Sequence, residues 1–249
     1  MSLQIPWLNS LIHFFMRGRE AAVKAVVPVL QSQFPFFNKL SMEQRKLFAA
    51  RVYLFSKSKN FHFLGMETNA DISTLVSAAA IQLTFGLPEF RFSYFEDIFI
   101  IKTAYTVGES NVPWAGHVTP QGIYVAWDHV QRGYATENDG YNVGLHEMAH
   151  AMEYELAFGA YAEDPKLGYR FTQLKLWMNE NILNRTASDN SFLFSEQGRN
   201  NVHECWAESV ELFFEKPAEL RQAYPDLYER ISLLLNQRQL GNVKADVVA

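Results

Sequence analysis

Two histidines and a glutamate stand close together in the stretch GLHEMAHAMEYE, residues 144–155. His146 and His150 are four residues apart, so on a helix they share one face, and a single ion can lie about 2 Å from a nitrogen of each. Glu147 follows the first histidine, where its carboxylate can reach a metal-bound water without binding the metal itself. The pattern is H-E-x-x-H in full, and it predicts metal-assisted hydrolysis with Glu147 as the general base.

The competing interpretation is a helix that carries two histidines by coincidence. The chain has seven histidines among 249 residues, so a chance pair at this spacing with Glu147 between is uncommon. The flanks are apolar, VGL before the motif and AMEYEL after it, and they predict a mostly buried helix. Because a buried imidazole pair without a partner is costly, these flanks favour a metal ligand pair.

A catalytic zinc site normally has three protein ligands and one open position for water, so a third ligand must come from elsewhere. The segment NNVHECWAESVELFFE offers three glutamates at i, i+4 and i+7, which a helix presents as one stripe. These are Glu204, Glu208 and Glu211, and His203 is a further candidate. Solvated helices often carry such stripes, so the residues alone leave the choice among the four open.

Helical patterns flank a central region of strands. Ser41 is a candidate helix cap with Gln44 three residues on, as in a capping box, and residues 70–86 form a second helical pattern. Aromatic and β-branched residues then dominate 90–105 and 116–130, which predicts strands in both segments. Helical patterns return at 142–157, at about 166–183, at 200–217 and at 225–237. The order predicts an α+β fold with helices around a small mixed or antiparallel sheet.

Composition narrows the classes of protein. Hydrophobic residues make up 48% and charged residues 20%, the balance of an ordinary globular protein. A net charge of -5 without runs of lysine or arginine predicts no direct nucleic-acid partner and no anionic membrane partner. The single cysteine, Cys205, excludes an internal disulfide and a cysteine-rich zinc module, so any metal must be held by nitrogen and oxygen.

The chain is expected to fold as one domain over residues 1–249, since it contains no repeat, low-complexity tract or long linker. The apolar runs at 7–15 and 21–30 are interrupted by MRGRE, and neither reaches the ~20 residues that span a bilayer. They predict short helices in an N-terminal extension, residues 1–35, packed on the domain. A cytoplasmic location is the default expectation.

Together, the strand GIYVAW, the helix HEMAH and the distal helix HECWAESVELFFEKP resemble the Mlc titration factor A-like zinc peptidases of bacteria. These are gluzincins, and their fold is similar to that of the anthrax lethal factor protease domain. The resemblance runs from about Phe36 to Asn236. It implies a zinc metallopeptidase that hydrolyses peptide bonds, with one zinc ion held by His146, His150 and Glu204.

The resemblance also assigns supporting residues. Glu211 matches a second, outer acid of the family, and Glu153 takes the place of a family aspartate that buttresses a ligand histidine. A tyrosine that the family usually places shortly before the third ligand, as an oxyanion donor, is missing from SFLFSEQGRNN. Candidate substitutes are His203, Asn200, Tyr134 and Tyr141.

Two further expectations come from the resemblance and from analogy with zinc proteases of this class. The strand GIYVAWDHV is expected to be an edge strand to which an extended peptide substrate adds by main-chain hydrogen bonds. The family is named for sequestering a transcriptional repressor of sugar uptake. The alternative function is therefore a regulatory protein that binds such a repressor and carries a latent zinc site.

Overall fold

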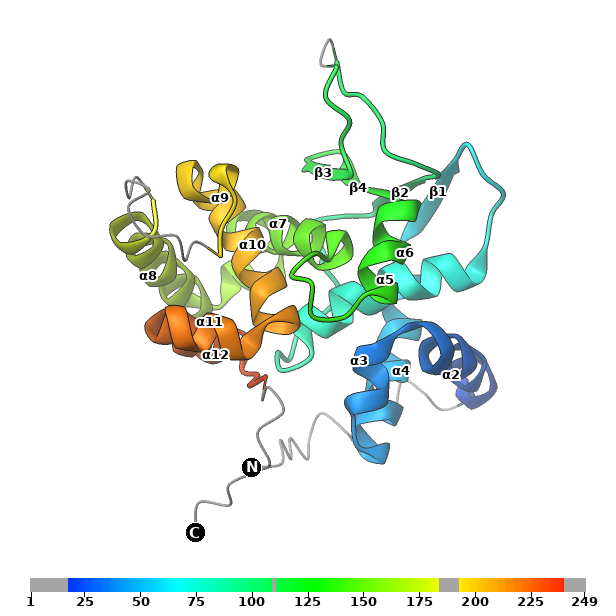
Figure 1. The fold of residues 1–249 in the computed structure, drawn as a ribbon. Helices are drawn as coiled ribbons and strands as arrows, with labels where there is room; N and C mark the ends of the chain where they lie inside the picture. The colour runs from blue at the N-terminus through cyan, green and yellow to red at the C-terminus, as the bar shows by residue number, and fades with distance from the viewer. Residues whose placement is uncertain (1–17, 109–110, 184–192, 240–249) are drawn as a thin grey trace.

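The computed structural model describes residues 18–108, 111–183 and 193–239 (Figure 1). Helices α2–α4 lie at one end of the molecule, α8–α12 lie at the other, and α5 and α7 run between them beside a small sheet (Figure 1). The predicted α+β fold is confirmed. The helices are α2 Glu20–Gln33, α3 Pro35–Lys39, α4 Met42–Lys57, α5 Ala70–Thr84, α6 Trp127–Ala135, α7 Val143–Phe158, the 3-10 helix η1 Ala160–Glu163, α8 Pro165–Asn181, α9 Glu196–Asn200, α10 Val202–Glu215, α11 Pro217–Ala223 and α12 Pro225–Leu235.

Polar caps fix where the helices begin. The predicted capping box of α4 is present: the Ser41 hydroxyl accepts the Gln44 backbone N–H, and the Gln44 side chain accepts the Ser41 N–H. Asn142 caps α7 by accepting the N–H of Leu145 at 3.1 Å, and Asn201 caps α10 by accepting the N–H of His203 at 2.8 Å. The two helices with the candidate ligands thus have defined first turns.

The sheet has four strands in the order β1-β2-β4-β3. Strands β1 (Asn60–Leu64), β2 (Asp97–Ile101) and β4 (Gly122–Ala126) are parallel, and β3 (Gly116–Thr119) pairs antiparallel with β4 at one edge. The expectation that GIYVAWDHV is the edge strand is therefore wrong. This segment forms the inner strand β4 and turns into α6 at Trp127, because the hairpin places β3 outside it.

Strand β1 was not expected from the sequence, and its five residues begin only two residues after the end of α4. The aromatic segment 90–105 contributes only β2, since Phe92 has a positive φ of 50° and begins a turn. The end of the aromatic segment is therefore a strand, and its beginning is a turn in which Phe92 and Phe95 are buried.

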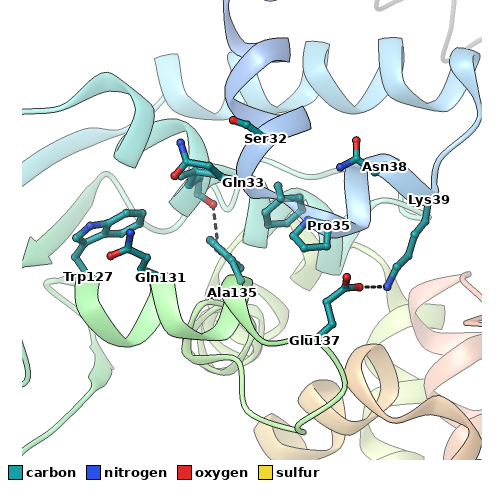
Figure 2. Close-up of a pocket in the computed structure, with 12 residues that line it drawn as sticks. Ser32, Gln33, Pro35, Asn38, Lys39, Trp127, Gln131, Ala135 and Glu137 are labelled. Carbon is teal, nitrogen blue, oxygen red and sulfur yellow. Dashed lines mark hydrogen bonds and ion pairs between the residues drawn. The ribbon is translucent and has the colours of Figure 1, made fainter.

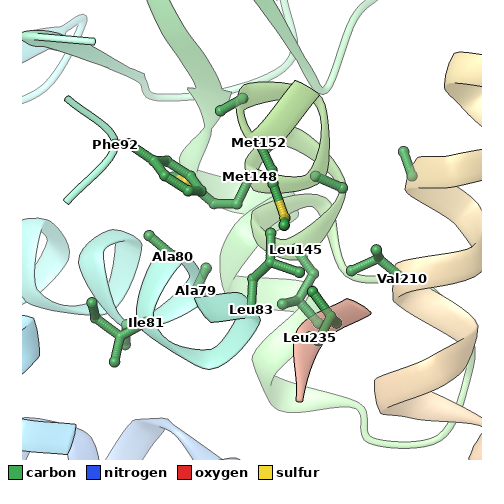
Figure 3. Packing of buried hydrophobic residues seen from close by; sticks show 14 of the residues in the cluster. Ala79, Ala80, Ile81, Leu83, Phe92, Leu145, Met148, Met152, Val210 and Leu235 are labelled. Atoms are coloured by element: carbon green, nitrogen blue, oxygen red, sulfur yellow. The ribbon is translucent and has the colours of Figure 1, made fainter. Parts of the chain in front are cut away.

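Buried apolar side chains from Val23 to Leu235 form one cluster. The inner face of the sheet contributes Ile98, Ile100, Ile123 and Val125. Figure 3 shows Ala79, Ala80 and Leu83 of α5 beside Leu145, Met148 and Met152 of α7. That the chain is one domain stays a prediction, and residues 1–17 of the expected N-terminal extension lie outside the described residues. Of the described helices, none is long and apolar enough to cross a membrane.

Candidate metal centre

Helix α7 presents two chemically different faces. Leu145, Met148 and Met152 recur at helical spacing and pack into the core, as Figure 3 shows. His146 and His150 lie on the other side, where they line a cleft. The predicted sharing of one helix face by the two histidines is present in the structure.

Three side chains converge on one point in this cleft. The Nε2 atoms of His146 and His150 are 3.2 Å apart, and the Glu204 carboxylate oxygens lie 3.3 Å from the first and 3.5 Å from the second. Ligands held about 2.0–2.1 Å from an ion at tetrahedral angles stand about 3.3 Å from one another. The three separations thus fit a tetrahedral metal site, and these residues form a group that could hold a metal ion.

Glu204 lies beside the two histidines because helix α10 packs against α7. Trp206 is fully buried, and its indole N–H donates to the Ala149 carbonyl of α7 at 2.8 Å. Because the Trp206 backbone belongs to α10 and its indole bonds to α7, this side chain fixes the distance between the two helices. Sequence reasoning did not assign Trp206 a role, although its place two residues after Glu204 was visible.

The remaining candidates for the third position point elsewhere. The Glu208 carboxylate accepts the backbone N–H of Ser195 at 2.8 Å and also the Ser195 hydroxyl, which ties α9 to α10. The His203 imidazole lies 2.8 Å from the carboxylate of Glu153. The structure therefore brings Glu204, and neither of these two residues, to the histidine pair.

Glu211 lies behind His146. One carboxylate oxygen is 2.9 Å from His146 Nδ1, and the other accepts the Asn142 N–H at 2.6 Å. A carboxylate at Nδ1 keeps the proton on that nitrogen and leaves the lone pair of Nε2 for a ligand bond. Its place beside His146 is the outer position that the family resemblance implies for Glu211.

Glu153 lies beside His150 but does not bond to it directly. Its carboxylate is 3.9 Å from His150 Nδ1, which is too long for a hydrogen bond, and it is instead held by His203 and by Lys175 at 3.1 Å. Glu153 therefore acts on His150 mainly through its charge. Lys175 was not anticipated from the sequence, because it belongs to α8 and lies beside the site only in the folded chain.

Glu147 is 4% exposed, and its Oε2 has no hydrogen-bond partner among the described residues. Burial raises its pKa to about 7, although His146 and His150 act in the opposite direction. A bound cation would lower this pKa, because positive charge favours the carboxylate. A buried, unpaired carboxylate oxygen beside a candidate ligand pair is suited to accept a proton from water.

The backbone of β3 presses against this carboxylate. A Cβ atom at Gly116 would lie 2.5 Å from both Cγ and Oε1 of Glu147, so the strand reaches the glutamate only because residue 116 has no side chain. The sequence GHVT alone did not predict that Gly116 contacts Glu147, because the contact joins β3 to α7, which are separate in the sequence.

The two histidines and Glu204 form a charged group when no metal is bound. Hydrogen bonds from His146 and His150 hold the pKa of Glu204 well below its usual range. Burial alone would lower the pKa of His150, but Glu153 and Glu204 raise it to about 9. Metal binding at this group would thus release protons, because a ligand imidazole must be neutral.

The cleft has a volume of about 1620 Å³. Among the residues considered as oxyanion donors, Tyr141, Asn200 and His203 line it. Tyr134 does not, because its hydroxyl is buried and donates to the Leu75 carbonyl at 3.0 Å. A smaller hollow of about 520 Å³ between α2, α3 and α6 contains the Lys39–Glu137 ion pair and lies apart from the histidines (Figure 2).

Comparison with known proteins extends the resemblance beyond the site. The model of a family described as glucose-regulated metallo-peptidase M90 matches residues 16–235, a range that includes both candidate ligand helices. An uncharacterized protein of Synechocystis sp. is 25% identical over 223 residues, which cover 81% of this chain and 79% of that protein.

Proposed function

We propose that this chain, which belongs to the glucose-regulated metallopeptidase family M90, hydrolyses peptide bonds with one zinc ion and with Glu147 as the general base. The observation that carries this proposal is the convergence of His146, His150 and Glu204 at separations of 3.2–3.5 Å, with the unpaired Glu147 carboxylate beside them. Membership of the family agrees with the resemblance inferred from HEMAH and ECWAESVELFF.

In the proposed reaction, His146, His150 and Glu204 hold the ion. When bound, zinc supplies Lewis-acid polarisation of the scissile carbonyl and lowers the pKa of a water to near neutrality. Glu147 accepts the proton of the attacking water at its unpaired oxygen and later delivers it to the leaving amine. Glu211 keeps the Nδ1 proton of His146 in place throughout.

Strand β3 is the part of the sheet suited to align a peptide. Ala126 donates to the Ala115 carbonyl at 2.7 Å, so in the antiparallel register residues 115, 117 and 119 bond towards β4. The N–H and C=O groups of Gly116 and Val118 then point away from β4, and both residues line the cleft. An extended substrate that adds to β3 would pass directly beside Glu147.

The alternative proposal is sequestration of a transcriptional repressor by a protein with a latent site. A latent site would be closed by a fourth side chain of the protein itself. Within the described parts of the chain, no fourth His, Cys, Asp or Glu joins the group formed by His146, His150 and Glu204. This open fourth position favours the peptidase.

The first test is mass-spectrometric detection of cleavage in a mixed peptide pool. Zinc-loaded protein is expected to cut peptides, and Glu147→Gln is expected to keep its zinc while losing about 10²–10⁴-fold in rate, because the proton acceptor is gone. Glu204→Ala is the metal-poor control. Undiminished cleavage by Glu147→Gln would refute the assignment of the base, and a zinc-loaded protein that cuts nothing would direct attention to the repressor-binding alternative.

A further inference from the structure

The cleft changes chemical character along α7. The residues of α7 that line it recur at helical spacing, and after Val143 they are the polar residues His146, Glu147, His150 and Glu153. In the last turns the lining residues are Tyr154, Leu156, Ala157 and Phe158, all of them aromatic or aliphatic. Phe158 is 68% exposed, although its ring lies 5.7 Å from that of Tyr94, which also stacks on Tyr154 at 5.6 Å. One end of the candidate catalytic groove is therefore aromatic.

Helix α8 forms the facing wall at this end. Phe171 lines the cleft and is held from behind by Trp206, whose ring centroid is 5.2 Å away in an edge-on arrangement. Gly168, one turn earlier on α8, also lines the cleft, and a Cβ added there would meet nothing within 4 Å. On this side of the cleft, α8 therefore presents the ring of Phe171 and, at Gly168, open space where another residue would place its side chain.

The charged side chains at the aromatic end of the cleft pair with each other. Of the described cleft-lining residues on α8 and on α7 beyond His150, the charged ones are Glu153 and Lys175, and they pair with each other at 3.1 Å. A charged side chain placed here would lose its hydration without gaining an unpaired counter-ion. An apolar side chain would instead transfer its surface from water to aromatic walls.

We infer that Tyr154, Phe158, Phe171 and the space over Gly168 form a subsite that selects a bulky apolar side chain, aromatic or branched aliphatic, of the bound peptide. The inference rests on the proposed function in that it takes a peptide along β3 as the occupant of the cleft. The subsite lies in the same cleft as His150 and Glu153, towards the end of α7.

Binding of labelled peptides to the zinc-loaded Glu147→Gln variant tests the subsite without requiring turnover. The probes are fluorescein-labelled decapeptides that are identical except for Phe, Leu, Ala, Lys or Asp at one central position, followed by fluorescence anisotropy. We expect the Phe and Leu peptides to bind about 10- to 100-fold more tightly than the Ala, Lys and Asp peptides.

The decisive variant is Gly168→Leu in the same Glu147→Gln background. Leucine fills the open space and is a better helix former than glycine, so loss of folding is not expected to confuse the result. The Phe-to-Ala preference should fall at least about tenfold, because the subsite no longer holds a ring. Tyr169→Leu is the matched control on α8, since Tyr169 is exposed and does not line the cleft.

Each outcome decides the inference. Equal binding of all five peptides, no binding of any of them, or a preference that survives Gly168→Leu would overturn it. Cleavage of the same peptides by the unaltered protein is measured in parallel. If that protein cuts nothing while Glu147→Gln still prefers Phe, the proposed peptidase activity fails and the apolar subsite stands.

Discussion

His146 is oriented by a residue that lies 65 positions away in the chain. Glu211 binds His146 Nδ1 and at the same time accepts the Asn142 N–H at the start of α7. One carboxylate therefore sets both the tautomer of the imidazole and the position of the helix that carries it. Removal of such outer partners typically costs 10- to 100-fold in metal affinity.

Glu211→Gln tests this role. The amide can still accept from one N–H but brings no negative charge to the imidazole, so we expect zinc affinity to fall about 10- to 100-fold, measured by competition with a chromophoric chelator. Glu208→Gln is the control on the same helix, since that carboxylate binds Ser195. An equal loss in both variants would mean that any charge on α10, rather than the contact with His146, supports the metal.

The motif residues were predictable at this scale because H-E-x-x-H is a local pattern whose geometry a helix dictates. The choice of the third ligand among Glu204, Glu208, Glu211 and His203 was not predictable from their spacing alone. It depends on the rotation of α10 about its axis, which Trp206 fixes by its bond to Ala149. The family resemblance, and not the stripe of glutamates, singled out Glu204.

At the scale of elements, the approach of β3 to α7 has a direct chemical consequence. Gly116→Ala would place a methyl carbon 2.5 Å from Oε1 of Glu147, so the carboxylate or the strand must move. We expect zinc content to be retained and kcat to fall about 10²-fold, the effect of a misplacement of about 1 Å. Thr119→Ala, at the far end of β3, is the control.

Loss of zinc together with activity in Gly116→Ala would show that the added methyl group disturbs α7 as a whole. Wild-type kcat in this variant would show that the Glu147 carboxylate can turn aside freely, and the proposed role of the β3 backbone in positioning it would be wrong.

The half-buried Lys59, between α4 and β1, binds the turn that connects α5 to β2. Lys59 donates to the Phe92 carbonyl at 2.7 Å and also to the Phe95 carbonyl, while Glu155 of α7 accepts the N–H of Tyr94 from the other side. Burial lowers the pKa of Lys59 from 10.5 to about 8. The turn thus joins the beginning of β1 to the end of α7.

This shift predicts a pH dependence of stability. Between pH 8 and 10.5 the unfolded chain keeps the Lys59 proton and the folded chain has released it, so the free energy of unfolding rises with pH over this window. Below pH 8 both states are protonated, and the folded state bears the cost of burying the charge.

Denaturant unfolding of the wild type and of Lys59→Met at pH 7 and pH 9.5 measures this contribution. The wild type should gain stability relative to Lys59→Met as the pH rises. Lys46→Met, which removes an exposed lysine of α4, is the control. A difference between wild type and Lys59→Met that stays constant or shrinks over this range would contradict the shift.

Element types were largely predictable, whereas strand order was not. Helices α4, α5, α7, α8, α10 and α12 were predicted from the sequence, because each carries apolar residues at helical spacing. The order β1-β2-β4-β3 depends on which strand the hairpin leaves outermost, and alternation in a short strand carries no such information. This is why β4 was mistaken for the edge and β1 was missed.

For the whole molecule, the proposed zinc site joins helices that are already packed. His146 and His150 belong to α7 and Glu204 to α10, and the bond from Trp206 to Ala149 connects the two helices without a metal. The apolar cluster from Val23 to Leu235 likewise needs no ion. Zinc is therefore expected to stabilise a fold that exists without it, unlike the metal of a zinc finger.

Removal of zinc by a chelator measures how much the ion stabilises the fold. A ligand that binds only the folded state at 100 times its dissociation constant stabilises by about 2.7 kcal/mol. For a chain of this size that corresponds to about 5–10 °C in Tm, so a zinc chelator should lower the melting temperature by this amount without unfolding the protein at 25 °C.

Glu147→Gln should show the same shift in melting temperature, because Glu147 does not bind the ion, and Glu204→Ala should show a smaller one. Unfolding of the wild type by the chelator at 25 °C would make the zinc structural, and the absence of any shift would mean that His146, His150 and Glu204 do not hold zinc.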